Sequence, residues 1–137
     1  MIYRIDVGIV APVKDTEVPD RVETAVRNVF PNATLAREPD RIVGETHSLD
    51  HFSELLHRQE ILDAARNAMS ARRSGPYFSF SLKKAAAFEG VVNFSVGEPD
   101  ELGEIDVEVR VEEPSVEAFV DHVAPPTEDG RPVTDRS

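Results

Sequence analysis

The side chains best suited to chemistry lie in a basic segment, residues 57–84, of an otherwise acidic chain. The segment has six basic and two acidic residues and therefore a net charge of +4, whereas the whole chain carries -11 and the remainder -15. The basic residues are Arg58, Arg66, Arg72, Arg73, Lys83 and Lys84, and Tyr77, Phe78 and Phe80 lie among them. Because basic side chains hold phosphates and aromatic rings stack on bases, the segment predicts an anionic polymer, RNA, as a partner.

Strand periodicity divides the aromatic residues of this segment. Phe78, Phe80 and Leu82 fall on one side of a predicted strand and are expected in the core, whereas Tyr77 falls on the other side. Tyr77 is therefore the predicted stacking residue. Each basic residue also has a plainer interpretation, since arginines suit the end of a helix and exposed charges need no partner. The predicted RNA-binding residues are Arg58, Arg66, Arg72, Arg73, Tyr77, Lys83 and Lys84.

A second group of polar residues has metal-binding side chains. His47, Asp50, Glu54 and His57 share one side of a helical projection, and His51 lies close by. Histidine and carboxylate together can bind zinc. His47 precedes the expected helix cap and no HExxH-type motif is present, so an exposed polar face explains the same pattern and no metal is predicted.

Other catalytic patterns are missing from the sequence. There is no cysteine, which excludes disulfides and thiolate chemistry, and there is no glycine-rich phosphate loop or GxSxG motif. Carboxylates are so numerous that pairs of them carry no information. We therefore expect neither an enzyme nor a bound cofactor.

Hydrophobic periodicity predicts the elements that position the basic segment. Strands are expected over 2–13, 34–38, 41–45, 77–82, 91–96 and 104–112. A first helix is expected after a cap at Asp15 or Thr16. A second begins after a cap at Ser48 and continues, bent or straight, through 59–72. A short helix or helical turn over 83–88 and a final helix after a cap at Ser115 are also expected. On the 59–73 helix, Arg66 and Arg73 are seven residues apart and nearly eclipsed.

This mixture of elements predicts an α+β fold with a single, mostly antiparallel sheet and helices packed on one face. Residues 1–123 are expected to form one domain, and the acidic, proline-rich residues 124–137 a disordered tail. No apolar run has the length of a membrane span, and the chain is expected in the cytoplasm. An excess of acids, with only three lysines, is similar to the composition of halophilic archaeal proteins.

Several short motifs resemble an uncharacterised archaeal family, protein family 0201 (UPF0201), which is predicted to bind RNA. They include Thr16-Glu17, Asn28-Val29-Phe30-Pro31, Arg58-Gln59, Asp63-Ala64-Ala65-Arg66, Gly90 with Asn93-Phe94, and Leu102-Gly103-Glu104-Ile105-Asp106-Val107. The family's Leu-Asn-Lys-Gln-Ala-Ala reads Leu82-Lys83-Lys84-Ala85-Ala86-Ala87 here, which retains Lys84 but loses both amides. The resemblance covers about residues 1–123. It implies a fold similar to ribosomal protein L-five and a homodimer.

Three hypotheses follow. The first is a non-catalytic RNA-binding protein. The second is a dimeric protein-interaction scaffold whose basic segment meets an acidic surface. The third is a metal-dependent enzyme that uses His47, His51, Glu54 and His57.

Overall fold

The computed structural model describes residues 2–96, 103–128 and 131–132. Its main element is one six-stranded antiparallel sheet in the order β2-β3-β1-β6-β5-β4. Its strands are β1 (Arg4–Pro12), β2 (Thr34–Glu38), β3 (Arg41–Thr46), β4 (Arg73–Ser74), β5 (Tyr77–Lys83) and β6 (Glu104–Glu113). The predicted α+β class and antiparallel sheet are confirmed.

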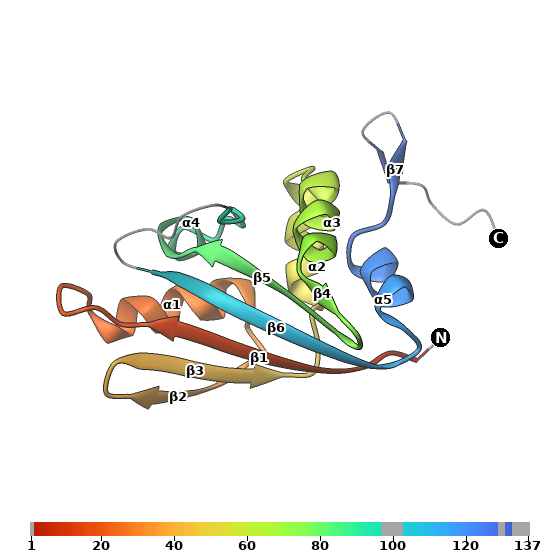
Figure 1. Cartoon of the computed structure of the whole chain (residues 1–137). Coiled ribbons are helices and arrows are strands. Elements are labelled where there is room, and N and C mark those ends of the chain that lie inside the picture. Colours follow the sequence, from red (N-terminus) through yellow and green to blue (C-terminus); the bar gives the residue numbers. More distant parts are fainter. Residues whose placement is uncertain (1, 97–102, 129–130, 133–137) are drawn as a thin grey trace.

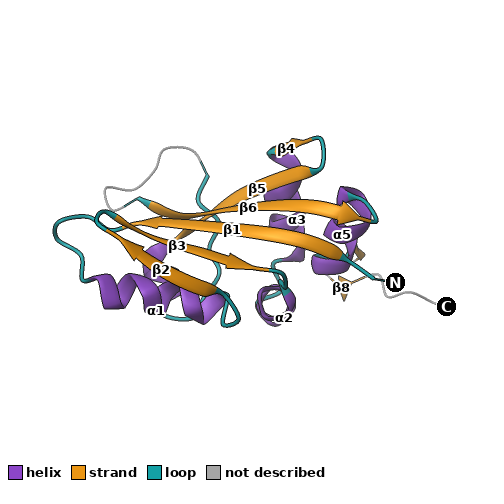
Figure 2. Cartoon of the chain, turned by 90° about the horizontal axis from the view of Figure 1, so that it is seen from below, coloured by secondary structure: helices purple, strands orange, loops and turns teal. Residues whose placement is uncertain are grey.

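Five helices cover one face of this sheet. They are α1 (Pro19–Val29), α2 (Asp50–Arg58), α3 (Leu62–Ala71), α4 (Lys84–Phe88) and α5 (Val116–Val123). Figure 1 shows the helices on one side of the strands, and Figure 2 shows the other side, where no helix lies over them. We call this uncovered side the open face. None of the helices in the described part of the chain has the length and apolar character needed to cross a membrane.

The central strands β1 and β6 alternate between buried and exposed residues. In β1 the residues at alternate positions from Ile5 to Ala11 are buried, and in β6 those from Ile105 to Val111. Phe78, Phe80 and Leu82 of β5 are buried as well, while Tyr77 is 39% exposed, as predicted from the period of two. The buried side chains pack against the apolar faces of the helices and form one core.

An aromatic cluster lies at the centre of that core. The ring of Phe52 on α2 stacks on Phe80 of β5 with centroids 5.0 Å apart and on Phe30 at 5.7 Å. Phe94 meets both Phe52 and Phe80 edge-on. The cluster therefore joins the sheet to α2 and to the segments that follow α1 and α4.

The structure differs from the predicted elements at several points. The second helix is predicted to continue through 59–72, but it ends at Arg58 and a separate helix, α3, begins at Leu62. The break occurs because Glu60 adopts a left-handed conformation (φ 58°) and because the Gln59 side chain hydrogen-bonds to the backbone N–H and the carbonyl oxygen of Val92. Residues 91–96 form one bridge, Leu82 to Phe94, rather than a strand. The N-cap of α1 is Val18, without a capping side chain, so the cap predicted at Asp15 or Thr16 is wrong. The N-cap of α2 is Leu49, one residue after the predicted Ser48, whose hydroxyl accepts a hydrogen bond from the Asp50 backbone N–H at 3.2 Å.

The end of the chain contains a further small pairing. Within the predicted tail, β7 (Thr127–Glu128) pairs with β8 (Arg131–Pro132), and the Thr127 hydroxyl bonds to Asp63 on α3. The other residues of that predicted tail after Glu128, namely 129–130 and 133–137, lie outside the described residues, as do residues 97–102.

Replacement of Phe52 tests the central role of the aromatic cluster. Phe52→Ala removes a fully buried ring with three aromatic neighbours, so the free energy of unfolding is expected to fall by about 3–5 kcal/mol. Phe88→Ala, at a ring that is 37% exposed, is the matched control and should cost clearly less. Urea denaturation of both variants measures the difference, and equal losses would contradict the assignment.

Ser115 provides a test of local helix formation. Its side chain accepts a hydrogen bond from the Ala118 backbone N–H at 3.1 Å and caps α5 as predicted. Ser115→Ala is expected to lower the free energy of unfolding by about 1 kcal/mol. Ser70→Ala, on the exposed side of α3, should change stability by less than about 0.5 kcal/mol in the same denaturation experiment.

Candidate nucleic-acid interface

The seven predicted RNA-binding residues lie in four different places. Arg66 and Arg73 face α5, Lys84 is in the interior, Arg58 is at the end of α2, and Arg72, Tyr77 and Lys83 lie on the open face. Arg72 and Arg73 are adjacent in the sequence but point to opposite sides of the sheet. Arg72 is the C-cap of α3 and Arg73 begins β4, and consecutive side chains of an extended segment point to opposite faces. The predicted alignment of Arg66 and Arg73 along one helix is therefore wrong, because α3 ends at Ala71 and Arg73 lies in β4.

Arg66 and Arg73 hold α5 against the end of α3. Arg66 Nη1 donates to Asp121 Oδ1 at 2.7 Å and to the carbonyl oxygen of Ala124 at 2.8 Å. Arg73 Nη2 lies 2.7 Å from Glu117 Oε2. A hydrogen bond from its own backbone, together with the one from Arg73, holds the pKa of Glu117 below its usual value. Both guanidinium groups thus have carboxylate partners within the fold.

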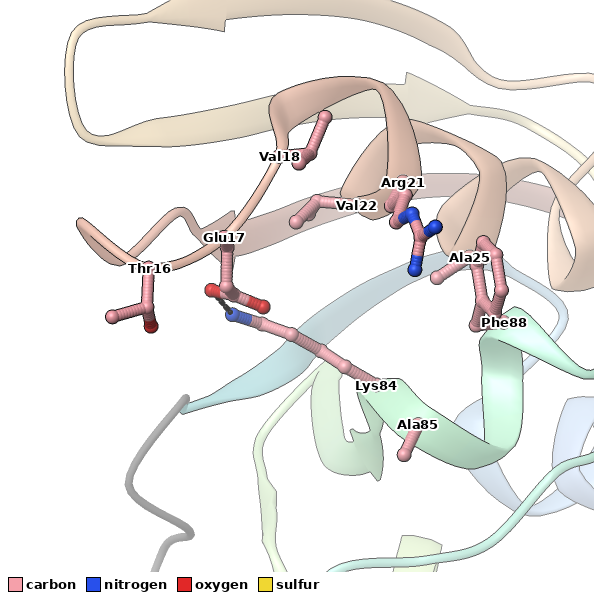
Figure 3. Close-up of a pocket in the computed structure, with 9 residues that line it drawn as sticks. All are labelled: Thr16, Glu17, Val18, Arg21, Val22, Ala25, Lys84, Ala85 and Phe88. Carbon is pink, nitrogen blue, oxygen red and sulfur yellow. Dashed lines mark hydrogen bonds and ion pairs between the residues drawn. The ribbon is translucent and has the colours of Figure 1, made fainter.

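Lys84 is buried although its sequence context predicts a surface charge. It is the first residue of α4, and its Nζ donates to Glu17 Oε1 at 2.8 Å and to the carbonyl oxygen of Pro12. Figure 3 shows the Lys84 side chain extending from α4 to Glu17. Because the ammonium group bridges α4 to the segment between β1 and α1, it is not available at the surface to hold a phosphate.

Arg58 occupies the last turn of α2 and is exposed. A cation there interacts favourably with the negative end of the helix dipole. Its position on the helical side of the molecule separates it from the residues on the open face.

Three of the predicted residues do share the open face. The Ser79 backbone N–H donates to the Arg72 carbonyl at 3.0 Å, which places Arg72 across from Ser79 at the edge of the sheet. Tyr77, Ser79, Ser81 and Lys83 follow at alternate positions along β5. Arg72 Nη1 donates to the neutral Ser81 hydroxyl at 3.1 Å and, among the described residues, forms no ion pair.

Arg110 completes this group, although it lies outside the basic segment 57–84. It is the register partner of Tyr77 across β5 and β6, with Arg72 diagonally placed on the other side of Tyr77. The alternation of 104–112 already indicated that Arg110 points away from the core, but its pairing with Tyr77 depends on strand register. We call Arg72, Tyr77, Lys83 and Arg110 the Tyr77 site.

Carboxylates surround the Tyr77 site. Arg110 Nη1 lies 2.7 Å from Glu112 Oε1 and 3.7 Å from Asp6 Oδ2, and Asp106 accepts a hydrogen bond from Ser81 at 2.6 Å. Glu108 and Glu104 stand opposite Ser79 and Lys83. The open face is therefore not a broad positive surface, and its cations act over short distances.

The histidines with metal-binding potential are dispersed. His47 Nδ1 lies 3.2 Å from Asp6 and 3.0 Å from the Ile5 carbonyl oxygen, whereas His57 Nδ1 contacts the Ser53 carbonyl oxygen of its own helix. His51 is 3.7 Å from Glu54. In the part of the chain that the structure describes, no three histidine or carboxylate side chains are placed to hold a metal ion.

Comparison with known proteins places the chain among archaeal proteins of matching length. A UPF0201 protein from Aeropyrum pernix is 35% identical over 141 residues, which cover 97% of this chain and 93% of that protein. The crystal structure of the UPF0201 protein from Methanococcus jannaschii superposes with a TM-score of 0.87 at 33% identity, covering 94% of this chain and 99% of that one. No family model matches the chain.

One relative is much longer than this chain. The UPF0200/UPF0201 protein of Archaeoglobus fulgidus is 37% identical over 130 residues, which cover 94% of this chain but only 40% of the length of the Archaeoglobus protein.

The likeness to ribosomal protein L-five that the motifs imply stays a prediction. The near full-length matches at 35% and 33% identity, in sequence and in structure, show that the chain belongs to the UPF0201 family of archaeal proteins.

Proposed function

We propose that this protein is a non-catalytic RNA-binding protein that holds a short single-stranded segment at the Tyr77 site. The observation that supports this proposal is an exposed tyrosine ring on an open antiparallel sheet, with Arg110 directly across from it and Arg72 diagonal to it. Aromatic side chains on an open sheet surface stack on unpaired bases, and adjacent guanidinium groups bind phosphates.

Arg72 is the proposed phosphate ligand. Its guanidinium group contacts a neutral hydroxyl, so phosphate binding requires no ion pair to break. Arg110 already shares its charge with Glu112 and Asp6 and is better placed to orient the stacked base. Lys83 lies six residues from Tyr77 on the same face, or roughly 20 Å along the strand, and provides a second contact for the backbone of the bound RNA.

The surrounding acids determine the kind of binding. With a net charge of -11, the chain repels nucleic acid over long distances, and high salt screens this repulsion. Stacking contributes about 1–3 kcal/mol per base and does not depend on charge. We therefore propose a site in which stacking and directed hydrogen bonds, rather than long-range attraction, hold the RNA at high salt.

Substitution of Tyr77 tests the stacking contact. Tyr77→Ala should weaken binding of single-stranded RNA by about 1–3 kcal/mol, whereas Tyr77→Phe retains the ring and should bind nearly as well as the wild type. Fluorescence anisotropy with labelled RNA purified from a haloarchaeal lysate, in molar KCl, measures both affinities. Failure of the wild-type protein to bind any RNA would refute the function.

Arg72→Gln tests the phosphate contact at the same site. We expect weaker RNA binding, because the amide carries no charge. Arg27→Gln is the matched control, since Arg27 is exposed in the last turn of α1, on the helical side of the sheet. Equal effects of both substitutions would refute the assignment of the site while leaving RNA binding itself intact.

A second candidate function is self-association through the open face. Val10, Val43 and Ala36 are register neighbours on β1, β3 and β2 and form a row of small apolar side chains, next to Gly8. On β3, Arg41 and Glu45 stand at opposite sides of Val43. If a second copy is placed antiparallel on this row, Arg41 of each copy lies opposite Glu45 of the other. A twofold axis requires this reciprocal pairing. The charge pattern thus favours a homodimer.

Val10→Glu tests this dimer. It places a charge in the centre of the apolar row, so the dimer should dissociate, and light scattering should report the mass of one chain instead of two. Val91→Glu, at a valine that is 43% exposed on the helical side, should leave the dimer intact. A monomeric wild-type protein at high concentration would contradict the proposal.

A further inference from the structure

A cavity of about 280 Å³ lies between α1 and α4. Both helices lie on the helical side of the sheet (Figure 1). Nine residues line the cavity. They are Thr16, Glu17, Val18, Arg21, Val22, Ala25, Lys84, Ala85 and Phe88. Figure 3 shows the side chains of both helices facing this space, with Lys84 and Glu17 at one end and Arg21 and Phe88 at the other.

Most of the cavity wall is apolar. Val22 and Ala25 of α1 are buried at its floor, while Val18 and Phe88 are 53% and 37% exposed and lie toward its opening. Apolar walls with a few polar groups are typical of sites for small organic molecules. The volume is suited to a ligand smaller than a typical drug.

The polar groups of the cavity have a net positive charge. The Lys84 ammonium group and the Glu17 carboxylate form a buried pair at 2.8 Å and neutralise each other. Arg21 adds a further positive charge. Its guanidinium carbon lies 5.6 Å from the centre of the Phe88 ring, and among the described residues it forms no ion pair.

The N-terminus of α1 adds to the positive charge of the cavity. Its N-cap, Val18, offers no side-chain hydrogen bond to the positive end of the helix dipole, and the acidic residue of its first turn, Asp20, is paired with Arg37. The cavity is therefore locally positive in a molecule whose net charge is -11.

We propose that this cavity is a binding site for a small organic monocarboxylate with an apolar body. The carboxylate pairs with Arg21 at the opening, and the apolar body occupies the space between Val22, Ala25 and Phe88. A single negative charge matches the single net positive charge of the lining. A dianion such as phosphate would leave one negative charge without a partner in the lining, because Lys84 is already paired with Glu17.

This proposal does not depend on RNA binding, because the two sites share no residue. The test is a titration followed by amide chemical shifts of the full chain, at constant ionic strength, with hexanoate and phenylacetate as probes. Hexanamide and phenylacetamide are the uncharged controls, and inorganic phosphate is the control for a bare anion. Saturable shifts confined to α1 and α4, with the carboxylates binding at least about tenfold more tightly than the amides and phosphate, are the expected result.

Two variants locate the binding site. Arg21→Gln should weaken carboxylate binding about tenfold, whereas Arg27→Gln, an exposed position on the same helix outside the cavity, should not. Ala85→Leu adds bulk at an exposed lining position, so the fold is retained and binding is lost. Equal affinity for acids and amides, tighter binding of phosphate, no saturable shift at α1 and α4, or unchanged binding by Arg21→Gln would each overturn the proposal.

Discussion

Burial of only one face of the sheet is the constraint on which the rest of this structure depends. The five helices cover one side of the strands and leave the other open, so each strand needs apolar and polar residues at alternate positions. β1 and β6 bury alternate residues from Ile5 to Ala11 and from Ile105 to Val111, and β5 buries Phe78, Phe80 and Leu82 on the same side. A shift of one residue in any of these strands would expose the core and bury charges.

The same alternation determines where the side chains of the basic segment lie. Arg72 and Arg73 are neighbours in the sequence, but Arg72 contacts Ser81 on the open face, whereas Arg73 contacts Glu117 of α5. Lys83 and Lys84 diverge in the same way, because the chain changes from strand to helix between them. A cluster of charge in the sequence thus becomes several separate contacts, most of them structural.

Buried charge has a distinct role on the helical side. Lys84 joins α4 to the segment between β1 and α1 through Glu17 and the Pro12 carbonyl, and this bridge forms one end of the cavity. A buried ion pair contributes little net stability when both partners are present, but removal of one partner leaves an unpaired buried charge. Such a pair favours a defined position of α4 relative to α1, which keeps the adjacent space open.

The sequence by itself determined the fold class, most element positions, the burial of Phe78, Phe80 and Leu82, and the exposure of Tyr77. These features depend on local periodicity, which is visible in a single chain. The break at Glu60, the missing strand at 91–96, the burial of Lys84 and the pairing of Arg110 with Tyr77 were decided by the tertiary structure. They depend on contacts between residues far apart in the chain, such as Gln59 with Val92 and Lys84 with Glu17, and on strand register, which no local pattern specifies.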